Sequence, residues 1–129
     1  MSDLSVPEYT LRVTERAARD MEAHLLRLER LIGPDVALAW REGILAAIGS
    51  LSRNPRRCAR IPEQARFHFE TRQLLYRRTP GGPAWRLLFT LTDEGQGTPD
   101  PPTVHLLHVR HAAERPVSAA EARTLESRE

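Results

Sequence analysis

Arginine is the residue type in this chain that is best placed to do chemistry. All 19 basic residues are arginine and none is lysine. The stretch from Arg53 to Arg86 holds nine arginines against Glu63 and Glu70, a local charge of +7 in a chain whose net charge is only +2, so the remainder carries −5. Guanidinium groups bind phosphates and carboxylates through paired hydrogen bonds and keep their charge. This segregation predicts a cationic surface for an anionic partner, with a merely solvated set of arginines as the alternative.

The histidines near the C-terminus raise the question of a metal site. His105, His108 and His111 lie in one short segment. Zinc sites need three or four converging ligands. In an extended strand His108 points away from His105 and His111, so we predict no metal.

The single cysteine and the overall composition limit the class of protein to which this chain can belong. Cys58 excludes an intrachain disulfide and fits a cytosolic setting; it is either a small buried filler or a thiol made reactive by its neighbouring arginines. With 129 residues, 40% hydrophobic and 28% charged, the chain suits one domain over residues 1–129, with its core in 9–115. Met1–Tyr9 lacks the apolar stretch of a secretion signal, and no segment has the length of a membrane span. We therefore expect a cytoplasmic protein.

Two amphipathic helices are predicted after a short strand. Residues 9–13 alternate apolar and polar side chains, as in a strand, and Thr14 is placed to cap a helix. Gly33-Pro34 suits the end of one helix and the start of the next. Apolar residues recur at spacings of three and four, at Ala18, Met21, Leu25, Leu28 and Ile32, then at Ala37, Trp40, Ile44, Ile48 and Leu51. The two helices must fold back as an antiparallel hairpin.

The apolar period changes from 3.6 to 2 in the second half of the chain. Strands are predicted at Phe67–Arg78, Ala84–Thr92 and Thr103–His111. Residues 79–83 form the first turn, and residues 93–102 are expected to form an exposed flexible loop. The fold class is therefore α+β: an N-terminal strand, an antiparallel helical hairpin, then a three-stranded antiparallel sheet with the hairpin on one face. Residues 118–129 are predicted to form a short C-terminal helix or a tail.

Strand alternation assigns the side chains to two faces of the sheet. The core face is predicted to hold Trp85, Leu87, Phe89, Leu91, Leu107 and Val109. The opposite face is predicted to hold Arg86, Leu88, Thr90, Leu106, His108 and Arg110. A shift of one residue would exchange the faces.

Several segments, in order, resemble one family. These are Leu11–Asp20 (LRVTERAARD), Arg53–Cys58 (RNPRRC), Phe69–Tyr76 (FETRQLLY), Trp85–Thr90 (WRLLFT) and Val104–His111 (VHLLHVRH). Together they are similar to the RelE/ParE superfamily of plasmid stabilisation toxins. The resemblance implies a toxin of a type II toxin–antitoxin module that arrests growth and is neutralised by a cognate antitoxin, a small acidic protein that wraps its arginine-rich surface and helical hairpin.

Two activities occur in the family that the chain resembles. RelE-like members cleave mRNA on the ribosome, whereas ParE-like members poison DNA gyrase, and a shared fold cannot choose between them. We expect a ribosome-dependent mRNA interferase, that is, an endoribonuclease that needs no metal or cofactor because arginine stabilises the phosphate charge. A ParE-like gyrase inhibitor and an inactive antitoxin-binding module are the alternatives.

The resemblance also implies site residues. By position Arg86 and Arg110 match the catalytic arginines of the RNase sites, and His108 or His111 would act as general acid or base. Nucleic-acid binding is assigned to Arg72, Tyr76, Arg56, Arg57 and Arg60, with Arg72 holding a phosphate and Tyr76 stacking on a base. The chain has no tyrosine after Arg110 and no lysine, and in both respects it differs from the RNase pattern.

Overall fold

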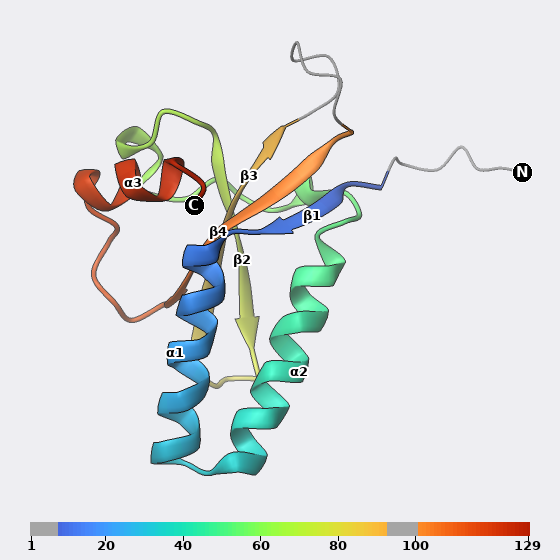
Figure 1. The fold of residues 1–129 in the computed structure, drawn as a ribbon, viewed down its shortest axis with the longest axis vertical. Coiled ribbons are helices and arrows are strands. Elements are labelled where there is room, and N and C mark those ends of the chain that lie inside the picture. The colour runs from blue at the N-terminus through green and yellow to red at the C-terminus, as the bar shows by residue number, and fades with distance from the viewer. Residues whose placement is uncertain (1–7, 93–100) are drawn as a thin grey trace, which may run out of the picture.

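The computed structural model describes residues 8–92 and 101–129. Its helices and strands, labelled in Figure 1, are β1 (Thr10–Val13), α1 (Glu15–Leu31), α2 (Pro34–Ser50), the 3-10 turns η1 (Pro55–Arg57) and η2 (Gln64–Arg66), β2 (Thr71–Arg77), β3 (Ala84–Thr92), β4 (Thr103–His111) and α3 (Ala119–Glu126). The predicted α+β class and element order are confirmed. The C-terminal residues form a helix, and most of the loop predicted at residues 93–102 lies outside the described residues.

The sheet has one strand more than the antiparallel meander predicted from the sequence. Its order is β1-β4-β3-β2. The strands β2, β3 and β4 pair antiparallel, as expected, whereas β1 joins the edge of β4 in parallel, with Thr10 opposite Thr103 and Val13 opposite Leu106. Thr14 then caps α1 as predicted, since its hydroxyl accepts a hydrogen bond from the Ala17 amide at 3.1 Å.

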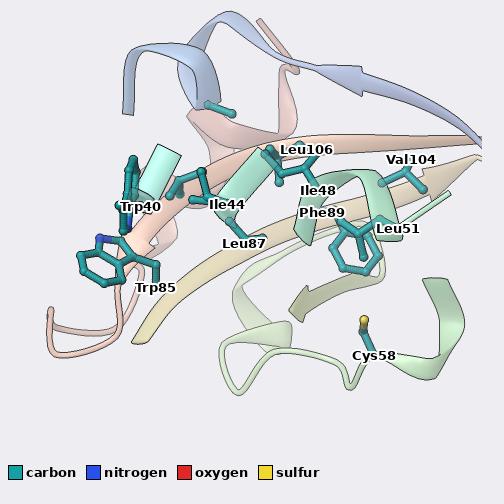
Figure 2. Packing of buried hydrophobic residues seen from close by; sticks show 12 residues of the cluster. Trp40, Ile44, Ile48, Leu51, Cys58, Trp85, Leu87, Phe89, Val104 and Leu106 are labelled. Atoms are coloured by element: carbon teal, nitrogen blue, oxygen red, sulfur yellow. The ribbon is translucent and has the colours of Figure 1, made fainter. Parts of the chain in front are cut away.

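The hairpin of α1 and α2 packs on one face of the sheet. Gly33, at φ 133°, and Pro34 make the sharp connection between the antiparallel helices (Figure 1). Trp40 and Ile44 of α2 meet Trp85 and Leu87 of β3 in the core (Figure 2), and the two indole rings meet edge to face at 5.5 Å. This core fills the space between α2 and the middle of the sheet.

The strand β2 begins four residues later than its predicted start. Residues 64–66 form a 3-10 turn, and the backbone amides of His68 and Phe69 donate to the Glu126 carboxylate at 2.5 and 2.9 Å instead of joining the ladder. Phe67 is buried in a second core. The alternation of apolar and polar residues therefore extends into residues 67–70, but tertiary contacts keep these residues out of the sheet.

A bulge in β4 corrects the predicted faces. Leu88 pairs with His108 but Phe89 pairs with Leu106, so Leu107 has no direct partner. Leu106 consequently packs in the hairpin core and Leu107 in the second core, the reverse of the prediction. An extra residue in one strand shifts the alternation by one. Residues beyond the bulge, including His108 and Arg110, keep their predicted faces. His105, before the bulge, lies opposite Thr90 and therefore on the same face as His108, so the prediction that these two histidines point apart is wrong.

The helix α3 covers the sheet face opposite the hairpin. A capping box starts it: the Ser118 hydroxyl accepts from the Glu121 amide, and the Glu121 carboxylate accepts from the Ser118 amide. The second core beneath it consists of Ile61, Phe67, Leu88, Leu107, Val117, Ala122 and Leu125. Among the described residues no helix is both long and apolar enough to cross a membrane.

Candidate functional site

Arg86 and Arg110 occupy facing positions on β3 and β4, under α3. They are direct cross-strand partners, and their residue exposures are only 8% and 2%. The structure thus brings together the two arginines assigned to catalysis, but places both inside the protein rather than on an open surface.

Glu63 holds Arg86 through a paired interaction. The two guanidinium amino groups donate to the two Glu63 carboxylate oxygens at 2.9 and 2.7 Å, and the Nε donates to the Gln73 side chain at 2.7 Å. The Val117 amide also donates to Glu63. Burial alone would raise the pKa of Glu63, but hydrogen bonds from Arg86 and from the backbone lower it to about 2. Each of the three guanidinium nitrogens of Arg86 therefore already has an acceptor.

Arg110 is held by the segment that leads into α3. It donates to the Arg115 carbonyl at 2.7 and 3.2 Å and to the Glu121 carboxylate at 3.3 Å. The pKa of Glu121 is lowered to about 2, first by the Ser118 amide and then, against the effect of burial, by Arg110. The C-terminal segment thus clamps Arg110.

His108 links Arg110 to α1. Its Nδ1 lies 2.5 Å from an Asp20 oxygen, and its Nε2 lies 3.1 Å from an Arg110 amino group. A guanidinium can only donate, so Nε2 accepts and the proton of a neutral ring must sit on Nδ1. Burial acts to raise the pKa of Asp20, but His108, the Val109 amide and Arg16 lower it overall. Both ring nitrogens are therefore engaged by side chains of the same chain.

The cations assigned to nucleic-acid binding form a different group. Arg72 is the cross-strand partner of Phe89, on the hairpin face, so alternation separates it from Arg86 and Arg110. Arg56, Arg60 and Arg72 all meet the carboxylate of Glu70, a surface side chain that is 37% exposed. This second site lies in the basic stretch predicted from the sequence.

Arg57, Tyr76 and His111 belong to neither group. Arg57 donates to the carbonyls of Arg53 and Asn54 at the end of the hairpin. The Tyr76 hydroxyl donates to the Trp40 carbonyl at 3.3 Å, and burial raises its pKa. The His111 ring lies against Trp85 at 5.1 Å, on the hairpin face and away from His108. The structure gives each of these side chains a packing or capping role.

The histidines, the cysteine and the acidic residues are the potential metal ligands in the part of the chain that the structure describes. No three histidine, cysteine, aspartate or glutamate side chains converge there. His105 bonds to the Thr92 hydroxyl, and burial, with Arg128 and Arg12, lowers its pKa to about 4. Cys58 is buried, which raises the pKa of its thiol despite the nearby arginines.

The carboxylates that pair with these cations were not predicted from the sequence. Glu63 and Glu70 are the two acidic residues between Arg53 and Arg86, and each binds arginines that had been assigned to function. An isolated acid in a strongly basic stretch was the available signal. Asp20 and Glu121 lie far away in sequence, so no local pattern linked them to His108 and Arg110.

Comparison with known proteins gives one similar fold. No family model and no curated protein matches the chain. A solved structure described as "Chromosomal ParDE TA system from P. aeruginosa" contains a chain of TM-score 0.58 and 20% sequence identity, with 82% of this chain and 98% of that chain covered. The expected RelE/ParE-like fold is therefore confirmed: this chain folds like a component of a ParDE toxin–antitoxin system.

Proposed function

We propose that this chain is the toxin of a type II toxin–antitoxin pair, silenced by a cognate acidic antitoxin, and that DNA gyrase is its target. The toxin assignment is supported by the ordered set of motifs that resemble RelE/ParE toxins, together with the fold shared with a chain of the ParDE system. The choice of target depends on the state of the residues that RNA cleavage would need.

The buried ion pairs of Arg86, Arg110 and His108 are the observation that favours gyrase over RNA as the target. Cleavage of RNA requires cations that can reach the phosphate and an imidazole that can exchange a proton with the sugar hydroxyl. Arg86, Arg110 and His108 are each engaged by a carboxylate of the same chain and are at most 8% exposed. A gyrase inhibitor needs none of the three as a catalyst, so their structural use is compatible with that activity.

One observation favours RNA cleavage as the second candidate. Arg86 and Arg110 are cross-strand neighbours, and the His108 Nε2 lies 3.1 Å from Arg110, so two cations and an imidazole share one small region. For this region to reach RNA, Glu63 and α3 would have to move away from the sheet. Such a movement would expose the second core and separate two buried ion pairs, at a substantial cost in free energy.

The outer surface of the hairpin supports an antitoxin partner. Leu38 and Leu45, seven residues apart on α2, are 53% and 44% exposed, and Leu31 and Ile32 at the tip are 67% and 61% exposed. Apolar side chains at this spacing form a stripe along a helix, which suits the apolar face of an amphipathic segment. Arg41 lies between the two leucines in sequence, where it suits an acidic partner.

Induced expression in a bacterial host tests the proposal. We expect growth arrest with accumulation of covalent gyrase–DNA complexes, no new codon-specific RNA ends, and rescue by co-expression of the cognate antitoxin. New RNA ends without gyrase complexes would establish the RNase instead. Harmless expression of folded protein would identify an inactive binding module.

His108→Gln separates the two targets within the same experiment. A glutamine amide can donate toward Asp20 and accept from Arg110, but it cannot act as an acid–base catalyst. Gyrase poisoning by this variant should equal that of the unchanged chain when thermal melting shows similar folding. Loss of toxicity in a folded His108→Gln protein would favour RNA cleavage.

A further inference from the structure

Glu70 is surrounded by three guanidinium groups from two segments of the chain. Arg72 donates to one Glu70 oxygen through Nε at 2.9 Å and through an amino group at 2.5 Å. Arg60 reaches the other oxygen at 3.3 Å, and Arg56 lies 3.7 Å from the carboxylate. Arg72 also donates to the carbonyls of Arg56 and Cys58, which fixes its guanidinium beside the basic connector.

Among the described residues, the positive groups around Glu70 outnumber the negative ones. Three positive groups share one carboxylate, and Arg128 lines the adjoining pocket as a fourth cation. Burial acts to raise the pKa of Glu70, but Arg72, Arg60 and Arg56 lower it overall, so the carboxylate stays ionised at neutral pH. Counted over the described residues, the cluster therefore stays positively charged after the Glu70 carboxylate is included.

The adjoining pocket adds an aromatic surface. It has a volume of about 210 Å³, and Arg56, Phe69, Arg72, Thr92 and Arg128 are among its lining residues. Phe69 is 50% exposed although it is a large apolar side chain. Arginines beside an exposed aromatic ring are the combination with which proteins hold single-stranded nucleic acid, since cations bind the backbone and the ring stacks on a base.

We infer that Arg56, Arg60 and Arg72 form a phosphate-binding site for single-stranded nucleic acid, that Phe69 stacks on a base next to that phosphate, and that the Glu70 carboxylate occupies the phosphate position while the site is empty. A phosphate must replace Glu70 in the guanidinium cluster, so Glu70 weakens binding. This site is separate from the Arg86–Arg110 pair and does not depend on which target the toxin attacks.

The aromatic side chain favours nucleic acid over an acidic peptide. A peptide carboxylate would pair with the arginines but would make no stacking contact with the exposed Phe69 ring. A nucleotide uses both features, because guanidinium forks match phosphate oxygens and every base has a face for stacking.

Binding of a fluorescein-labelled single-stranded oligonucleotide of about 12 nucleotides to the purified full chain, followed by fluorescence anisotropy, tests the inference. Glu70→Gln should bind about fivefold more tightly, because it removes one like charge about 4 Å from the phosphate at the high dielectric of an exposed site. Glu42→Gln on the exposed surface of α2 is the matched control, since it changes the net charge equally. Equal effects of the two variants would overturn the inference that the Glu70 carboxylate competes with the phosphate.

Two further variants test the phosphate and the stacked base. Arg60→Ala should weaken binding and lower the slope of log affinity against log salt by about 0.7 for one lost phosphate contact. Phe69→Ala should weaken oligonucleotide binding by about fivefold or more. An unchanged affinity in Phe69→Ala, with full competition by a polyglutamate peptide at equal charge, would assign the cluster to an acidic protein segment and overturn the nucleic-acid assignment.

These measurements use protein and oligonucleotide alone. Their failure would leave the gyrase and antitoxin readouts of the proposed function untouched, and the converse holds as well.

Discussion

Arg86 and Arg110 stand opposite each other on β3 and β4, and each is ion-paired with a glutamate from a different part of the chain. Two buried cations in facing positions would repel each other without those carboxylates. Glu63 comes from the connector before β2, and Glu121 from α3. The pairs therefore join the connector, the sheet and the C-terminal helix through one charge-balanced layer.

Breaking one of these pairs is expected to be costly. Glu63→Gln should lower the free energy of unfolding by about 3–5 kcal/mol, because it leaves Arg86 buried without a counter-charge. Urea denaturation measures the change. Arg53→Ala is the control, since the Arg53–Glu8 pair is exposed and should contribute less than about 1 kcal/mol. The double variant Glu63→Leu/Arg86→Met should be more stable than Glu63→Gln; a double variant that is less stable would contradict this account of the pair.

Acid should weaken the fold in a defined range. The folded-state pKa values of Glu63 and Glu121 are about 2, below the ordinary value of 4.5. A lowered folded pKa stabilises the protein fully above the unfolded value, and this stabilisation is lost as the pH falls through the folded value. The free energy of unfolding should therefore decline between pH about 4.5 and about 2. The decline should be shallower in Glu63→Gln, and parallel curves would argue against the assigned shift.

Tyr76 makes Gly43 a position where no side chain fits. A Cβ on Gly43 would lie 1.9 Å from the Tyr76 hydroxyl and 2.7 Å from the ring, whereas a Cβ on Gly49 of the same helix meets nothing within 4 Å. Gly43→Ala should destabilise the chain by about 1–3 kcal/mol through overpacking. Gly49→Ala should stabilise it by about 0.5–1 kcal/mol through helix propensity. Thermal melting of both variants checks the opposite signs, and equal shifts would refute the close contact.

The tautomer of His108 follows from its two hydrogen bonds. Because Arg110 donates to Nε2, the neutral ring carries its proton on Nδ1, next to Asp20. Long-range ¹H–¹⁵N spectra should show a protonated Nδ1 and an unprotonated Nε2. Asp20→Asn should disturb this pattern, and a wild-type ring protonated on Nε2 alone would contradict the Arg110 contact.

Negative charge on the outer face of the hairpin should block the antitoxin. The double variant Leu38→Glu/Leu45→Glu removes two exposed leucines and should reduce antitoxin affinity by at least about tenfold, as expected for losing anchor residues of an interface. Ala39→Glu/Ala46→Glu adds the same charges at neighbouring exposed positions of α2 and should have a smaller effect. Co-purification and calorimetry measure both, and equal losses would indicate a general charge effect.

Periodicity predicted the elements well because each one repeats over many residues. The stripe on α2, the Thr14 cap and the extents of β3 and β4 were readable in the sequence. The stripe predicted on α1 was right at Met21, Leu25 and Leu28 but wrong at Ala18 and Ile32, which are exposed. The partner of β1 and the bulge at Leu107 were not, since both depend on contacts between distant segments. One inserted residue was enough to exchange the faces of Leu106 and Leu107.

The candidate site was harder to predict because charge alone does not reveal a partner. The sequence indicated which arginines are concentrated in the basic stretch, but the carboxylate that meets each one is set by tertiary structure. Arg110 pairs with Glu121 of α3, and His108 pairs with Asp20 of α1. Residues that looked like catalysts are therefore ion-paired inside the protein. In the described part of the chain, three arginines meet the single carboxylate of Glu70 at the surface.

The parallel pairing of β1 with β4 has a consequence for biosynthesis. In the sheet, Thr10 to Val13 pair with Thr103 to Leu106, so β1 cannot join the sheet until β4 has been synthesised. Closing so long a loop carries a large entropic cost and slows folding. The nascent chain should consequently keep β1 unpaired until residues 103–106 have been synthesised, which gives a binding partner time to meet it before the sheet is complete.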